Sequence, residues 1–85
     1  MCRIIEIDVA KATKFSARTF GRAVRQERLR LSLSQEDFAE KAGIHRTYVS
    51  SVELGKVSVG IEVANQLAIA LELRLSELIS RAESA

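Results

Sequence analysis

Four polar residues that could hydrogen-bond to the edges of nucleic-acid bases stand close together in the middle of the chain: Arg46, Thr47, Ser50 and Ser51. A guanidinium can donate two hydrogen bonds to O6 and N7 of guanine, and a threonine can offer its hydroxyl to a base and its methyl group to thymine. The two serines are short, so they suit a close approach. The alternative is an ordinary solvated polar face. Which of these two interpretations is favoured depends on the helices that position these residues.

Catalytic residues are not indicated by any pattern in the sequence. The single histidine, His45, has no serine or cysteine nucleophile motif beside it, no glycine-rich phosphate loop is present, and the carboxylates are scattered. The single cysteine, Cys2, has no partner for a disulfide within the chain and is expected to be an inert thiol. We therefore expect no enzyme activity, no metal site, no cofactor and no small-molecule ligand.

The composition predicts one all-α domain. The chain has 85 residues, of which 47% are hydrophobic and 28% charged, and it contains no proline. This is an ordinary globular balance, and strong β-formers do not alternate over most of the chain, so helices joined by short turns are expected. No segment resembles a signal peptide or reaches the roughly 20 apolar residues of a membrane span, which favours a cytoplasmic protein without membrane contact.

The charge is unevenly distributed along the chain. Up to Arg30 there are eight Lys and Arg against three Asp and Glu, whereas the remainder carries five against eight. A basic half suits a polyanion such as DNA, whose phosphates attract without sequence preference. A solvated arginine-rich helix face explains the same count, so charge alone does not identify a partner.

Residues 1–15 are predicted to be an N-terminal extension, and residues 16–85 to be the helical domain. Ile5, Ile7 and Val9 alternate with polar residues in the extension, which is typical of a short strand. A flexible leader is one alternative, and an edge strand that pairs with its copy in a dimer is another.

Five helices are predicted from the spacing of apolar side chains and from their caps, over approximately 16–31, 35–42, 46–54, 61–71 and a short stretch at 75–79. Ser34 can cap the free amides of the second helix. Gly43 and Gly55 tolerate left-handed backbone geometry and are expected to end the second and third helices.

The second and third helices fit a crossing near a right angle with a tight glycine turn between them. Small, branched and aromatic residues stand at the seven positions that such a crossing uses: Phe38, Ala39, Ala42, Gly43, Ile44, Val49 and Val52. Ala39 must be small because the third helix passes over it. If Ile44, Val49 and Val52 face inward, the four polar residues of the third helix face outward.

This arrangement resembles the lambda-repressor-like, or Xre-type, helix-turn-helix family from about Phe20 to Ile79. The resemblance is carried by residues 33–39 (LSQEDFA), 53–56 (ELGK), 68–71 (AIAL) and 75–78 (LSEL). Within the family, residues 43–50 (GIHRTYVS) look most like the controller proteins of restriction-modification systems.

The chain departs from the usual controller pattern at several positions. Leu54, Val57 and Ser58 stand where controllers usually carry an arginine and an Arg-Asn pair. Glu72 replaces the usual glycine after helix four, and Arg74 replaces the usual serine cap of helix five, so both caps should be weakened without a change of fold.

The resemblance implies a five-helix fold whose third helix enters the major groove of double-stranded DNA, with Arg46, Thr47, Ser50 and Ser51 on the bases. Contacts to the DNA backbone are expected from Gln35, His45, Tyr48, the amide of Gly55, and Lys56. For Tyr48, packing of the ring is an equal alternative. Arg28 and Glu53 resemble the structural ion pair that links helix one to the end of helix three in this family.

A single helix-turn-helix reads only a few base pairs, so a homodimer on a pseudo-palindromic operator is expected. The apolar residues at the end of the chain are the predicted dimer interface: Leu71, Leu73, Leu75, Leu78 and Ile79. The alternative is that these residues close the base of the monomer core.

The function that the resemblance implies is a sequence-specific transcriptional regulator, with a restriction-modification controller as the narrower expectation. The alternative is an antitoxin or adaptor module that binds a protein partner through the helix-turn-helix body. An outward face of Arg, Thr and Ser on the third helix favours DNA, because a protein-binding face would be more apolar.

Overall fold

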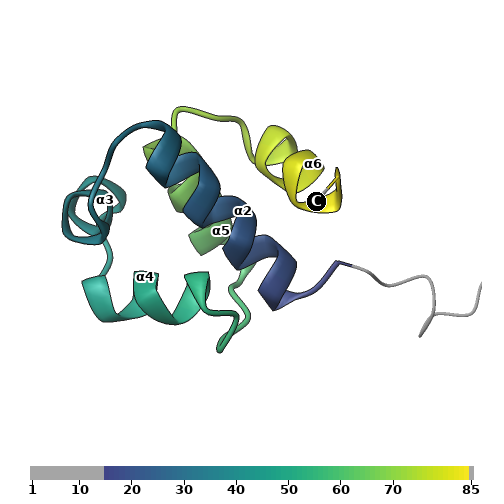
Figure 1. Ribbon diagram of the computed structural model, residues 1–85, viewed down its shortest axis with the longest axis horizontal. Helices are drawn as coiled ribbons and strands as arrows, with labels where there is room; N and C mark the ends of the chain where they lie inside the picture. Colours follow the sequence, from purple (N-terminus) through teal and green to yellow (C-terminus); the bar gives the residue numbers. More distant parts are fainter. Residues whose placement is uncertain (1–14, 85) are drawn as a thin grey trace, which may run out of the picture.

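Five helices make up residues 15–84, the part of the chain that the computed structural model describes (Figure 1). They are α2 (Ala17–Arg30), α3 (Gln35–Ala42), α4 (Arg46–Glu53), α5 (Ile61–Ala70) and α6 (Leu75–Ser84). Residues 15–84 contain no strand, which confirms the all-α fold class. Cys2 and the strand predicted near Ile5 lie outside the described residues.

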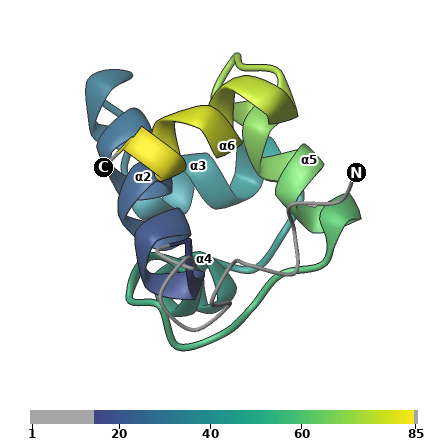
Figure 2. The same cartoon turned by 90° about the vertical axis from the view of Figure 1, so that its right-hand side faces the viewer.

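The helix α2 crosses the middle of the molecule and packs against α4 and α6 (Figure 1). The helix α3 packs against α4 and α5, and Figure 2 shows α6 lying across α2 and α5. Each of the five helices therefore has an apolar side that faces the others. The largest fully buried side chains lie on all five helices, except for Leu71, which directly follows α5. They are Val24, Phe38, Val49, Val52, Leu67, Leu71 and Leu78.

Local capping fixes where α2 and α3 begin and where α3 ends. Ser16 and Thr19 form a reciprocal capping box, in which each backbone amide donates to the other side chain. The hydroxyl of Ser34 accepts a hydrogen bond of 3.0 Å from the amide of Asp37. Gly43 ends α3 with a φ of 74°, which glycine adopts without steric cost. The predicted start and end of α3 are confirmed.

The last helix is longer than the sequence predicted, because contacts with α2 stabilise its second half. The helix α6 continues to Ser84, and Ala82 in its last turns is only 2% exposed. Arg81 Nη1 donates to Glu27 Oε1 of α2 at 2.7 Å. The periodic pattern of leucines and isoleucines ends at Ile79, so it does not reveal these contacts.

The connection between α5 and α6 compensates for its two unusual cap residues. Glu72 adopts the left-handed conformation, with a φ of 63°, where a glycine would be unstrained. The backbone amide of Arg74 donates to Glu77 Oε1 at 2.8 Å, so Glu77 satisfies an amide at the start of α6 although Arg74 has no capping side chain. The fold is therefore unchanged, as expected.

Gly21 determines how closely α2 approaches α4. A Cβ atom at this position would overlap the carbonyl oxygen of Val52 and lie 3.0 Å from the carbonyl oxygen of Glu53. Both obstacles are backbone atoms, which cannot rotate away as a side chain can. Nothing in the local sequence distinguishes this glycine from an ordinary helical one, so the sequence did not identify it.

We predict that Gly21→Ala destabilises the fold by about 1–3 kcal/mol, because α2 and α4 must separate to admit the new methyl group. A loss of stability would be informative, because alanine in a helix interior is otherwise more stable than glycine by about 1 kcal/mol. Urea unfolding followed by circular dichroism measures the change. Gly60→Ala is the control, because a Cβ there meets nothing within 4 Å and the cost is limited to the poorer capping of α5 by alanine; an equal loss of stability in the two variants contradicts the prediction.

Candidate nucleic-acid interface

The turn between α3 and α4 consists of Gly43, Ile44 and His45. With Gly43 in the left-handed conformation, the amide of Ile44 donates back to the carbonyl oxygen of Ala39 at 3.0 Å. Ala39 is 2% exposed, so its small side chain lies inside the contact between the two helices. The turn directs α4 along the lower edge of the molecule in Figure 1, and one side of α4 faces away from the other helices.

The four residues predicted to contact bases lie on that outward side of α4. Val49 and Val52 form the inner side and are at most 1% exposed. Arg46 and Thr47 are exposed, and Ser50 and Ser51 are half-buried. The structure therefore brings an arginine, a threonine and two serines together on one surface, with the longer and better exposed side chains in the first turn of the helix.

His45 and Tyr48 flank this surface in different environments. His45 is the N-cap residue of α4 and is exposed, and its Nδ1 lies 3.3 Å from the hydroxyl oxygen of Thr47. Tyr48 is half-buried and packs against the core. The ring packing that the sequence allowed for Tyr48 is thus present, and its contact with a phosphate remains a prediction.

Arg28 and Glu53 form a buried, bidentate ion pair between α2 and the last residue of α4. The Nε and Nη2 atoms of Arg28 donate to the two carboxylate oxygens of Glu53 at 2.6 and 3.0 Å. The Nη1 atom of Arg28 donates to the carbonyl oxygen of Leu33 at 2.7 Å, just before α3. The side chains of the pair are 8% and 2% exposed, so these hydrogen bonds replace water around both charges.

Gln35 also belongs to this cluster, which the sequence did not predict. Its Nε2 donates to Glu53 Oε1 at 3.0 Å, so the side chain at the start of α3 is held by the end of α4. The backbone amides of Gln35 and Glu36 precede the first intrahelical hydrogen bond and suit an anion at this helix start. Any phosphate contact of Gln35 would therefore use its backbone amide or its second side-chain hydrogen.

The amide of Gly55 is not free for the phosphate contact that the sequence predicted. Its amide donates to the carbonyl oxygen of Val52 at 3.0 Å, so the amide is engaged in ending α4 and does not offer itself to a phosphate. Gly55 matters instead for packing, because a Cβ there would lie 2.8 Å from the Cα atom of Arg18. Arg18, an exposed cation of α2, therefore lies beside Gly55, the residue that precedes the exposed Lys56. The sequence did not single out Arg18.

Two of the five residues predicted to form the dimer interface lie in the monomer core instead. Leu71 and Leu78 are 0% exposed within a single chain, because α5 and α6 pack on each other through them. For these two residues the alternative, closure of the core, is correct. Leu73, Leu75 and Ile79 are half-buried and retain surface.

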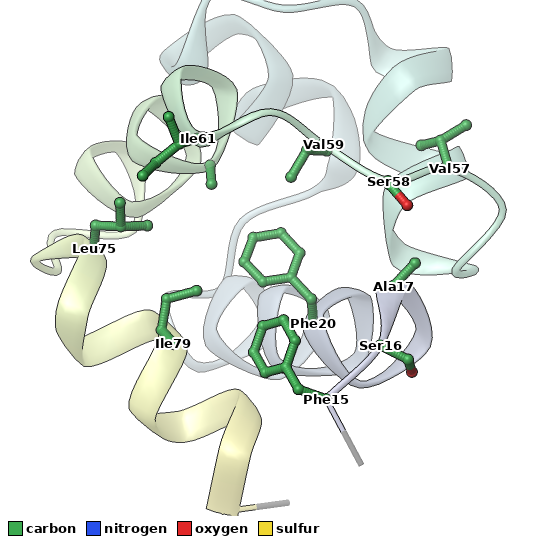
Figure 3. A pocket seen from close by; sticks show the side chains of 11 residues that line it. Phe15, Ser16, Ala17, Phe20, Val57, Ser58, Val59, Ile61, Leu75 and Ile79 are labelled. Carbon is green, nitrogen blue, oxygen red and sulfur yellow. The ribbon is translucent and has the colours of Figure 1, made fainter. Parts of the chain in front are cut away.

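Leu75 and Ile79 line an apolar hollow of about 400 Å³ between the start of α2, the loop after α4, and α6 (Figure 3). Figure 3 shows Phe20 and Ile61 on the other walls of this hollow. Ile61 is 74% exposed, and Ile69, two turns further along α5, is 64% exposed. The surface near the end of the chain is therefore apolar, as the sequence predicted, but it includes α5.

Residues 15–84 contain no group of three or more His, Cys, Asp or Glu side chains that could hold a metal ion. Within the same range, no helix is long and apolar enough to cross a membrane.

A family model described as helix-turn-helix (HTH_3) matches residues 24–78. The chain belongs to this helix-turn-helix family. It is 38% identical over 61 residues to control protein C.BamHI of Bacillus amyloliquefaciens, and the aligned region covers 71% of this chain and 75% of that protein. It is 43% identical over 51 residues to control protein C.MunI of a Mycoplasma species, and this aligned region covers 60% of this chain and 69% of that protein.

Solved structures agree with this assignment. The restriction-modification controller protein C.AhdI of Aeromonas hydrophila superposes with a TM-score of 0.71 at 37% identity, over 73% of this chain and 94% of that one. The clp gene regulator ClgR of Corynebacterium glutamicum superposes with a TM-score of 0.77 at 22% identity, over 80% of this chain and 87% of that one. At this level of identity the superposition supports the fold alone. The resemblance to the helix-turn-helix family and to its controllers is confirmed.

We predict that Arg28→Ala lowers the stability of this helix-turn-helix domain by about 3 kcal/mol, because it leaves the carboxylate of Glu53 buried without its cation. At saturating protein concentration the base preference should not change. Arg30→Ala is the matched control, since its ion pair with Glu27 involves a guanidinium side chain that is 52% exposed and should contribute at most about 1 kcal/mol. An unchanged melting temperature for Arg28→Ala contradicts the prediction.

Proposed function

We propose that the chain is a sequence-specific transcriptional regulator that binds a pseudo-palindromic DNA operator as a homodimer. The observation that carries this proposal is the outward face of α4. Arg46 and Thr47 project from its first turn with exposed side chains, and the inner face is fixed to the core by Val49 and Val52. A polar helix face held outside the body of a helix-turn-helix fits the major groove.

The charges around α4 support contacts to the DNA backbone. Lys56 follows α4 and Arg18 lies beside the adjacent Gly55, and both cations are exposed. The start of α3, where the Gln35 side chain donates to Glu53 at the end of α4, presents the backbone amides of Gln35 and Glu36. On this proposal these groups bind phosphates and orient α4, while Arg46 and Thr47 read the bases.

The narrower role that we propose is control of a restriction-modification operon. Proteins named as controllers of such systems are similar to this chain over most of their length, and none of those compared above is named as an enzyme. Leu54, Val57 and Ser58 replace residues usual in controllers, so the operator sequence should differ from those of typical controllers.

A protein partner for the helix-turn-helix body is disfavoured by the composition of the α4 face. Protein interfaces are enriched in aromatic side chains and depleted in charge at their centre. The α4 face has one arginine, one threonine and two serines. Within residues 15–84, Leu54 is the single large apolar residue exposed on this face.

The second copy is proposed to bind the apolar surface of α5 and α6. Of the residues that the sequence predicted, Leu73, Leu75 and Ile79 retain surface. Ile61 of α5 lines the same hollow as Leu75 and Ile79, and we include the exposed Ile69, two turns further along α5, in the proposed surface. To bind a pseudo-palindromic operator, the dimer must present its two copies of α4 one DNA turn apart, about 34 Å.

Base readout is tested by selecting bound sites from random duplex DNA with the wild-type protein and with Arg46→Ala. We expect a palindromic site from the wild type, and loss of one guanine preference in each half-site from the variant, at a cost of about 1–3 kcal/mol per contact. Lys56→Ala is the control, which should weaken binding to all duplexes alike and reduce the salt dependence by about one counterion per chain. If Arg46→Ala selects the wild-type site unchanged, Arg46 does not read bases.

The dimer surface is tested with Ile69→Glu, which should sediment as a monomer at concentrations where the wild type is a dimer. The side chain is 64% exposed, so the charge should disrupt the interface without unfolding the chain. Leu29→Glu is the matched control, because Leu29 is 51% exposed on α2, outside the proposed surface, and should leave the dimer intact. An intact dimer of Ile69→Glu rules out α5 as part of the interface.

A further inference from the structure

Leu54 is a large apolar residue that the fold leaves on the outward side of α4. Its side chain is 60% exposed, although the residue directly follows two helical positions that are buried, Val52 and Glu53. The backbone of Leu54 is still helical, with a φ of −85° and a ψ of −3°, so its side chain continues the helical pattern of α4. Burial in the monomer therefore does not account for an apolar side chain at this position.

The position of Leu54 on the helix places it with the residues proposed to read bases. It follows Thr47 by seven residues, which is two turns, so the two side chains lie on the same stripe of α4. Ser50 lies one turn before Leu54 on the same side. The distance from Thr47 along the helix axis is about 10 Å, or roughly three base-pair steps.

We propose that Leu54 determines specificity by contacting the C5 methyl group of a thymine in the major groove. This inference rests on the proposed function, since it assumes that α4 lies in that groove. The thymine methyl is the large apolar group on the major-groove edges of the base pairs, and the other groups that distinguish the bases there are hydrogen-bond donors and acceptors. A leucine can satisfy neither, so opposite another base it would remove water from polar atoms without replacing their hydrogen bonds.

The neighbours of Leu54 favour a base contact. Ser50 and Ser51 are short and half-buried, so they do not hold the groove away from the leucine. Lys56 and Arg18, near the same end of α4, suit the phosphates beside the groove. The other large apolar residues that are exposed in residues 15–84 belong to α2 and α5, so Leu54 has no apolar neighbours among them on α4 with which to form a protein-binding patch.

The test removes the methyl group from the DNA and the leucine from the protein separately. Starting from the site that the wild type selects, each thymine of one half-site is replaced in turn by deoxyuridine, which differs only by the C5 methyl. We expect one replacement to weaken wild-type binding about fourfold, the ratio that corresponds to one buried methyl group. The same replacement should leave Leu54→Ala unaffected, and Leu54→Met should behave as the wild type because it keeps an apolar contact.

Leu29→Ala is the matched control, since it removes an equally apolar and exposed side chain from α2 and should keep the full dependence on the methyl group. If no thymine distinguishes the wild type from Leu54→Ala while Arg46→Ala still loses its guanine preference, this inference is overturned and the proposed function stands. If Leu54→Ala binds every duplex as the wild type does, the leucine has another partner, such as a protein, and the inference is also overturned. If the wild type selects no site at all, both fail together.

Discussion

The carboxylate of Glu53 joins three helices and thereby fixes the direction of α4. It stands at the end of α4 and accepts hydrogen bonds from Arg28 of α2 and from Gln35 of α3, and Arg28 also donates to the backbone before α3. A buried carboxylate is tolerated only when its cation and hydrogen bonds are all in place, so alternative orientations of α4 are strongly disfavoured. The network therefore ties the end of α4 both to α2 and to the start of α3.

The close approach of α2 and α4 complements this network. Gly21 allows the two backbones to meet, and Gly55 allows the chain after α4 to pass beside Arg18. Within α4, the buried residues Val49, Val52 and Glu53 lie on its inner side or at its C-terminal end. The outward residues Arg46 and Thr47 are exposed and make no contribution to the core, so they can be substituted while the fold is retained.

The fold followed from the sequence wherever its determinants are local. Ser34 and Gly43 act within a few residues of themselves, so the limits of α3 were predictable. Contacts between distant segments were not: the same apolar spacing fits a core or an interface, and only the packing of α5 on α6 places Leu71 and Leu78 inside. The hydrogen bond from Gln35 to Glu53 spans 18 positions, so no local pattern indicates it.

If the proposed function is correct, the small number of cations around α4 explains why DNA binding requires a second copy of the chain. Each chain offers one arginine to the bases and a small number of cations, chiefly Arg18 and Lys56, to the phosphates near α4. Since affinity for DNA depends largely on the number of phosphates neutralised, one chain alone would bind weakly. Two linked copies make the second set of contacts intramolecular, so occupancy of the operator depends on the concentration of dimer.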